Sequence, residues 1–256
     1  MTCSPLFDLE ELNISQKSDL ILEPRYRANI DSVTPLSARK TFEKLDSCFL
    51  GISLNNSNFE PAKFKAIVEW ISRKFSHCIL LIGDSMHRIT LEITRSLEPE
   101  IAVAEALKMG SSFIQENEHI FSTVERQTTF VFETCSQIKT SKDYVYFYSG
   151  LQAYFENDTK FRSSIEAFGR KYHTNPLRNL NNDLLEQHIR LSCEYFLEEF
   201  AIIACLQKRG FPVRGFPVML YPGSIGPLLE IANGEHPDIC EELKQLVIVA
   251  LKFKKR

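Results

Sequence analysis

The chain lacks the glycine-rich loops that hold nucleotide phosphates. Only 10 of its 256 residues are glycine, and neither the Gly-x-Gly-x-x-Gly pattern nor the Gly-x-x-x-x-Gly-Lys-Ser/Thr pattern occurs. The six histidines show no metal-ligand spacing, and the seven cysteines include no Cys-x-x-Cys pair. We therefore expect no dinucleotide, ATP or metal site. The cysteines are expected to be reduced and mostly buried, because their number is odd and they are scattered.

Long hydrophobic runs are also missing. The longest lie near 78–82, 200–206 and 246–251 and are too short to cross a membrane. The first five residues show no basic segment followed by an apolar one, so we expect no signal peptide and a cytoplasmic protein. A net charge of −3 argues against DNA binding and against a generally basic surface, so an RNA partner would need a local patch. The candidate clusters, each more commonly a solvated face, are Arg162, Arg170, Lys171 and Arg178; Lys208, Arg209 and Arg214; and Lys252, Lys254, Lys255 and Arg256.

Short apolar segments alternate with longer helical patterns along most of the chain. Pro61 suits the first turn of a helix, in which Phe64, Ile67, Val68 and Ile71 recur at helical spacing. This alternation predicts an α/β fold, with a Rossmann-like, mostly parallel five-stranded sheet and helices on both faces. The strands are expected at about 47–53, 77–83, 129–135, 216–221 and 246–253, and the helices after the one at Pro61 at about 85–96, 98–121, 158–172 and 183–209.

The predicted domain organisation is simple. Residues 1–40 are expected to form a partly ordered arm, with a short helix near 37–45. Residues 41–256 are expected to form one catalytic domain, with a helical insertion at about 136–180.

Ser53 lies where an apolar strand ends, and polar turn residues follow it. In an open α/β sheet, the carboxyl end of a buried strand is where ligands bind. Asn56, three residues later, could orient a bound group or could merely belong to the turn. Tyr221 ends a second predicted strand, where a tyrosine by itself is more often part of the packing.

Glu199 is the second candidate, because it projects from the apolar arc of the helix predicted at 183–209. Glu186, Glu194 and Glu198 are predicted on the polar side of this helix. A carboxylate among apolar side chains must find a partner or change its pKa. Two interpretations stay open: a buried ion pair with an arginine, or a carboxylate that holds a substrate ammonium group. The phenol of Tyr195, one turn away, would assist the second role.

Taken together, these segments resemble the tRNA-dependent cyclodipeptide synthases. The resemblance spans roughly residues 47–253 and implies a fold similar to the catalytic domain of class I tyrosyl- and tryptophanyl-tRNA synthetases. The family lacks ATP signatures, as this chain does. The matching segments are Gly51-Ile52-Ser53 with Asn56, Pro61 to Phe75, Leu80 to Ser85, Tyr195 to Glu199, and Leu220-Tyr221-Pro222.

The resemblance implies a role for each matching residue. Ser53 is the nucleophile that receives the first aminoacyl group, Tyr195 and Glu199 hold its amino group, and Tyr221 relays protons. Pro222 places the chain in the Tyr-Pro subgroup, although Asn56 is typical of the subgroup with histidine at that position. The residues assigned to substrate binding are Gly51, Asn56, Phe49, Leu81 and Met219, the last three lining an apolar first aminoacyl pocket of limited size.

The resemblance thus implies an enzyme that makes a cyclic dipeptide (a 2,5-diketopiperazine) from two aminoacyl-tRNAs. It works by a ping-pong route through an aminoacyl-serine and a dipeptidyl-serine, with no cofactor. We expect a monomer. Some members grip tRNA with an arginine-rich helix, but residues 98–121 contain one lysine and no arginine, so that contact is not transferred.

Two alternatives stay open. A serine hydrolase is one, although residues 51–55 lack the second glycine of Gly-x-Ser-x-Gly and no triad spacing is evident. The other is a noncatalytic module that binds tRNA or amino acids.

Overall fold

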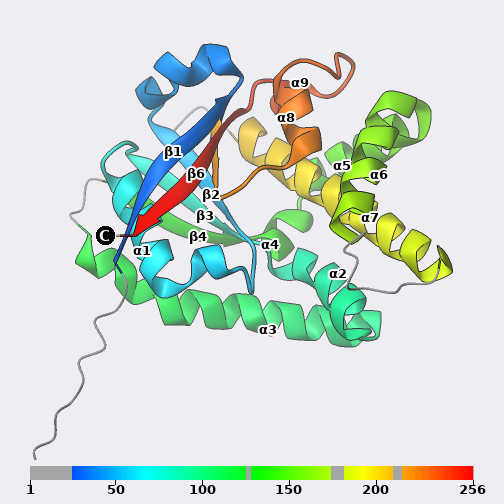
Figure 1. Ribbon diagram of the computed structural model, residues 1–256, viewed down its shortest axis with the longest axis horizontal. Coiled ribbons are helices and arrows are strands. Elements are labelled where there is room, and N and C mark those ends of the chain that lie inside the picture. Colours follow the sequence, from blue (N-terminus) through cyan, green and yellow to red (C-terminus); the bar gives the residue numbers. More distant parts are fainter. Residues whose placement is uncertain (1–24, 125–127, 174–181, 210–214, 256) are drawn as a thin grey trace, which may run out of the picture.

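A twisted, mostly parallel sheet forms the centre of the molecule (Figure 1). The computed structural model describes residues 25–124, 128–173, 182–209 and 215–255. The strand order is β1-β6-β5-β2-β3-β4, and all neighbours are parallel except the antiparallel pair β1 and β6. The strands are β1 (Tyr26–Thr34), β2 (Ser47–Ile52), β3 (His77–Ile82), β4 (Thr129–Thr134), β5 (Val218–Tyr221) and β6 (Val247–Lys255).

The central strands are apolar on both faces, as expected of parallel strands covered by helices on both sides. On β2, Phe49 belongs to the core under one helical layer, whereas Cys48 and Leu50 belong to the core under the other. Met219 of β5 lies beside Phe49 and points to the same side. These continuous apolar runs are the reason that the sequence pattern located five of the strands.

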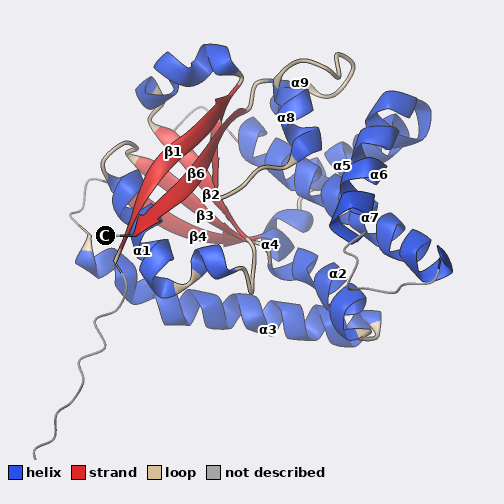
Figure 2. Ribbon diagram, in the orientation of Figure 1, coloured by secondary structure: helices blue, strands red, loops and turns tan. Residues whose placement is uncertain are grey.

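Helices cover both faces of the sheet (Figure 2). Side chains of α1 (Pro61–Ser72) and α3 (Pro99–Asn117) pack on one face, and α1 begins at the proline predicted to open it. The helices that contribute to the other core are α2 (Asp84–Arg95), α4 (Cys135–Lys139), α5 (Lys142–Asn157), α6 (Thr159–His173), α7 (Asn182–Lys208), α8 (Gly226–Ala232) and α9 (Glu241–Lys244). Among the described helices, none is long and apolar enough to cross a membrane.

The sheet has six strands, so the prediction of five was one short. The additional strand, β1, lies in the segment expected to be an irregular arm, of which residues 1–24 fall outside the described residues. Residues 36–40 and 42–44, where a short helix was expected, form two 3-10 helices, η1 (Leu36–Lys40) and η2 (Phe42–Lys44). Two more 3-10 helices are η3 (Ser57–Phe59) and η4 (Glu118–Thr123). β1 escaped prediction because its sequence is half polar and it pairs only with β6, at the other end of the described chain.

Candidate active site

The structure brings Ser53 and Tyr221 into direct contact. Ser53 follows the last residue of β2, and Tyr221 is the last residue of β5. Because β2 and β5 are parallel neighbours, their carboxyl ends meet at one edge of the sheet. The hydroxyl oxygens of Ser53 and Tyr221 lie 3.0 Å apart, although 168 residues separate them in sequence. The two candidate hydroxyls therefore form one hydrogen-bonded pair.

A second bond joins the same two loops. Asn58 donates its side-chain amide to the carbonyl oxygen of Pro222 over 3.1 Å. The side-chain oxygen of Asn56 accepts the backbone N–H of Asn58 at 3.0 Å, so Asn56 caps η3 and also lines the cavity described next. The sequence pointed to Asn56 but not to Asn58. Only the three asparagines at 55, 56 and 58 indicated an unusual turn, and Pro222, the partner of Asn58, is remote in sequence.

A cavity of about 650 Å³ opens above this pair. It is lined by five of the residues predicted for the site: Ser53, Asn56, Tyr195, Glu199 and Tyr221. Helix α2 forms much of another wall of this cavity, and this contribution was not predicted from the sequence. The additional lining residues with polar side chains are Asn55, His87, Thr90, Thr94, Arg95, Ser192 and Ser224.

Gly51 and the predicted pocket residues lie beneath this cavity. A Cβ at Gly51 would be 3.8 Å from side-chain atoms of Met219 and Tyr221, so glycine keeps this space open. Phe49, Leu81 and Met219 are buried in the core between the sheet and α7, and they are not among the residues that line the cavity. Their assignment to a first aminoacyl pocket stays a prediction.

Glu199 lies half-buried in the cavity wall, on α7. Its Oε2 atom is enclosed and has no hydrogen-bond partner among the described residues. Burial raises the pKa of Glu199 from 4.5 to about 7, because removal from water disfavours the charged form. Of the two interpretations of this carboxylate, the buried ion pair with an arginine is not found among the residues that the structure describes.

The buried ion pair belongs to the neighbouring residue, Glu198. We expected Glu198 on the polar side of the helix, and that prediction was wrong: only 4% of the residue is exposed. Its Oε1 atom lies 2.9 Å from Arg88 of α2 and 2.8 Å from Lys139 of α4. Because α7 packs against α2 and α4 as well as α5 and α6, it buries more than the single face that helical periodicity assumes.

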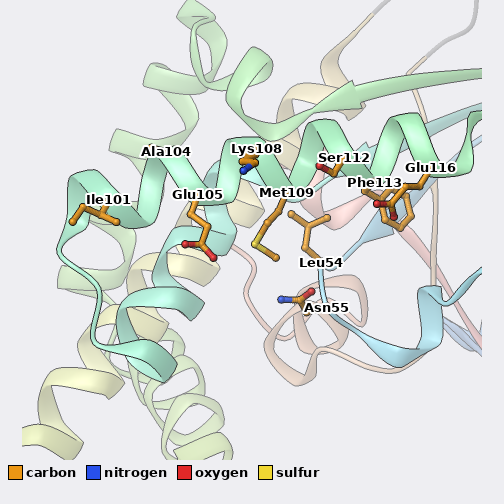
Figure 3. A pocket seen from close by; sticks show the side chains of 10 residues that line it. All are labelled: Leu54, Asn55, Ile101, Ala104, Glu105, Lys108, Met109, Ser112, Phe113 and Glu116. Atoms are coloured by element: carbon orange, nitrogen blue, oxygen red, sulfur yellow. The ribbon is translucent and has the colours of Figure 1, made fainter.

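A second hollow, of about 660 Å³, runs along α3 beside the catalytic cavity (Figure 3). Leu54 and Asn55 line both, and an ion pair between Arg95 and Glu105 joins their walls. The hollow contains one cation, Lys108, and two carboxylates. Its charge therefore does not favour RNA. Its lining residues are Leu54, Asn55, Ile101, Ala104, Glu105, Lys108, Met109, Ser112, Phe113 and Glu116.

The family model named cyclodipeptide synthase matches residues 29–203, more than half of the chain. The chain belongs to the cyclodipeptide synthase family. No protein of curated function matches it.

Solved structures of cyclodipeptide synthases share the fold. One from Fluoribacter dumoffii is 22% identical with a TM-score of 0.73, covering 91% of this chain and 100% of that one. A Mycobacterium tuberculosis protein, whose structure relates cyclodipeptide synthetases to type I tRNA synthetases, is 12% identical with a TM-score of 0.65, covering 90% and 94%. The synthase of Candidatus Glomeribacter gigasporarum, solved with Phe-tRNAPhe bound, is 17% identical with a TM-score of 0.58, covering 82% and 88%. The predicted likeness to synthetase catalytic domains is thereby confirmed.

Several residues of the first two basic clusters form ion pairs. Arg170 pairs with Glu186, Lys208 with Asp143, and Arg209 with Glu133. Arg178, Arg214 and Arg256, which we also named, lie outside the described residues.

The third cluster, at the end of β6, is paired only in part: Lys252 lies 2.8 Å from Asp31 of β1. Lys254 lies directly opposite Arg27 of β1, and both are exposed with no ion pair among the described residues. Like charges opposite each other destabilise an antiparallel pair, so this end of the ribbon favours an anionic partner.

Proposed function

We propose that the chain makes a cyclic dipeptide from two aminoacyl-tRNAs by a ping-pong route through Ser53. The observation that carries this proposal is the contact of Ser53 with Tyr221 in a cavity that also holds the unpaired carboxylate of Glu199. An aminoacyl ester on tRNA is already activated. The absence of ATP-binding patterns in the sequence is therefore consistent with the reaction.

In the first step, Ser53 Oγ attacks the ester carbonyl carbon of the first aminoacyl-tRNA. The Oγ–carbon bond forms, the bond from that carbon to the ribose oxygen breaks, and uncharged tRNA leaves as an alcohol. Tyr221, 3.0 Å from Ser53, passes the serine proton toward the leaving oxygen. A phenol with an ordinary pKa near 10 suits a relay better than a standing base. The product is an aminoacyl ester on Ser53.

Glu199 binds the ammonium group of this aminoacyl unit, with the phenol of Tyr195 beside it. A charge-assisted bond of this kind is strong where water is excluded. Because the pKa of Glu199 is raised to about 7, the carboxylate can also accept a proton from the ammonium group near neutral pH. The freed amine then attacks the carbonyl carbon of the second aminoacyl-tRNA: the C–N bond forms, the bond to the ribose oxygen breaks, and the second tRNA leaves as an alcohol that takes up the amine proton. The product is a dipeptidyl ester on Ser53.

Cyclisation ends the cycle. The terminal amine of the dipeptide attacks the ester carbon on Ser53, which closes the six-membered ring and returns the serine hydroxyl. Asn56, which lines the cavity, is available to contact the substrate through the amide nitrogen that its cap of η3 does not use. We further propose that Phe49, Leu81 and Met219 favour an apolar first residue and that Pro222 marks the Tyr-Pro subgroup.

The free end of the β1–β6 ribbon is our candidate for the tRNA contact. β6 pairs with β5 only as far as Ala250, so Leu251 to Lys255 continue past the end of β5 at the same edge as Ser53. Phosphate contacts from lysine and arginine dominate the affinity for nucleic acids. The basic side chains of this end are Arg25, Arg27, Lys252, Lys254 and Lys255.

Ser53→Ala tests the proposal, with Ser57→Ala in the adjacent exposed turn as the control. We expect intact-protein mass spectrometry to show an aminoacyl adduct on wild type and on Ser57→Ala after mixing with charged tRNA. Ser53→Ala should show no adduct and should release no cyclic dipeptide into the medium of expressing bacteria. Release of product by Ser53→Ala at the normal rate would rule out the serine route.

The two alternatives make different predictions for the same proteins. A serine hydrolase would turn over a p-nitrophenyl ester rapidly without tRNA, yet the partner of Ser53 is a tyrosine, not a histidine, within the described chain. A noncatalytic module would bind charged tRNA and release no product.

A further inference from the structure

Two half-buried cations pair with Glu198, the residue before Glu199 on α7, and take no part in the chemistry proposed above. Arg88 of α2 and Lys139 of α4 both reach the Oε1 atom of Glu198, at 2.9 and 2.8 Å. Arg88 also lies 2.7 Å from Glu194, whereas Lys139 has no second ion pair among the described residues. Lys139 thus depends on Glu198 alone for its counter-charge.

The adjacent glutamates of α7 therefore stand in opposite electrostatic settings. Among the described residues, Glu198 is held by two cations and Glu199 by none, although only one peptide bond separates them. Burial raises the pKa of Glu199, and no neighbouring cation lowers it again. Burial raises the pKa of the Cys135 thiol on α4, the charges of Asp84, Glu199 and Glu198 raise it further, and that of Lys139 lowers it.

We propose that Glu198 is a positioning residue that holds Arg88 and Lys139 away from Glu199, so that Glu199 stays free for the substrate ammonium group. This inference rests on the role proposed for Glu199. A lysine and the substrate ammonium are chemically alike and compete for the same carboxylate. A protein that places a half-buried lysine near such a site must therefore give it another partner.

The competition follows from the energetics of buried charges. Removing one member of a buried ion pair leaves the other uncompensated, which is strongly unfavourable. The four-carbon stem of lysine is flexible, so its ammonium can turn toward the nearest carboxylate. In Glu198→Gln, Arg88 keeps Glu194 as a partner, and Lys139 is left to pair with Glu199.

The test is a double-mutant cycle on formation of the aminoacyl-Ser53 adduct, measured over a range of charged-tRNA concentrations. For Glu198→Gln we expect KM to rise about tenfold or more with kcat little changed, since a competing cation weakens binding by at least one ion-pair interaction. Lys139→Met should keep the wild-type KM. The double variant Glu198→Gln/Lys139→Met should return KM to within about threefold of wild type, because the competitor is gone. Glu194→Gln, which leaves the pair of Lys139 and Glu198 intact, is the matched control.

A merely structural role for Glu198 predicts the reverse, with the double variant at least as impaired as Glu198→Gln. No recovery, or an unchanged KM in Glu198→Gln, would overturn the inference. If Glu198→Gln does not fold, Glu198→Asp replaces it. Its side chain is one methylene shorter, so its carboxylate lies farther from Lys139 and KM should rise. Adding Lys139→Met should cancel that rise. Failure to cancel it would equally overturn the inference.

Glu199→Gln separates this inference from the function on which it rests. If Glu199→Gln binds and reacts like wild type, the proposed role of Glu199 is wrong. If it is impaired while the double variant shows no recovery, only the role of Glu198 is wrong.

Discussion

Glu199 has a proposed role in the site, but its carboxylate lowers the stability of the folded protein. Its carboxylate is enclosed without an ionic partner among the described residues, so ionisation in the folded protein is unfavourable. Its pKa rises from 4.5 to about 7 on folding. A carboxyl group with a raised pKa contributes its full stability below pH 4.5 and loses it as the pH rises to 7, because the unfolded chain ionises first.

We therefore predict that Glu199→Gln stabilises the fold at high pH while it impairs adduct formation. At pH 8 the free energy of unfolding should exceed that of wild type by roughly 3 kcal/mol, and at pH 4 the two should be equal. Urea unfolding at both pH values measures the difference. The exposed Glu186→Gln should stay within about 0.5 kcal/mol of wild type at both. Equal stability of wild type and Glu199→Gln at pH 8 would show that the carboxylate is hydrated.

At the scale of elements, the position of α4 depends on a closely packed junction with α2 and α3. Asp84, the first residue of α2, is 3% exposed, and its carboxylate accepts the backbone N–H of Ser136 at 2.9 Å and its hydroxyl at 2.5 Å. Gly110 of α3 packs against Asp84: a Cβ there would lie 2.6 Å from the Cβ of Asp84. The junction fixes the start of α4, which carries Lys139.

Gly110→Ala should therefore lower the free energy of unfolding by about 1–3 kcal/mol, the usual cost of overpacking. Gly150→Ala is the matched control, because that glycine also lies within a helix but a Cβ would meet nothing within 4 Å. It should raise stability by about 0.5–1 kcal/mol, since alanine is the better helix former. Chemical denaturation of both variants gives the comparison. If both changes prove equally stabilising, the junction is looser than the distances indicate.

At the scale of the whole molecule, the basic end of the β1–β6 ribbon lies on the side away from α5 (Figure 1). Lys254→Glu should weaken binding of charged tRNA about tenfold at low salt and flatten the dependence of log K on log salt by about 1–2 units. Lys142→Glu, on α5, makes the same change in net charge and should alter affinity less than about twofold. Filter binding at several salt concentrations distinguishes them. Equal losses in both variants would mean that tRNA responds to net charge rather than to the ribbon.

The sequence predicted those parts of the molecule that depend on local pattern. The parallel strands are continuous apolar runs, and Ser53 and Tyr221 were recognisable because each ends such a run. β1 is half polar and needs β6 as a partner, so no local window could show it. Glu198 was misplaced for a related reason: the helical pattern assumes one buried face, whereas contacts with α2 and α4 bury a second. The bond from Asn58 to Pro222 likewise joins loops that only the folded sheet brings together.

During synthesis, β2, β3 and β4 leave the ribosome in the order in which they stand in the sheet, so they can pair as they emerge. β5 and β6 come later and add on the other side of β2. Such long-range pairing is slow compared with local contacts. Ser53 thus emerges 168 residues before Tyr221. A half-made chain thus holds Ser53 without Tyr221, the residue proposed to relay its proton.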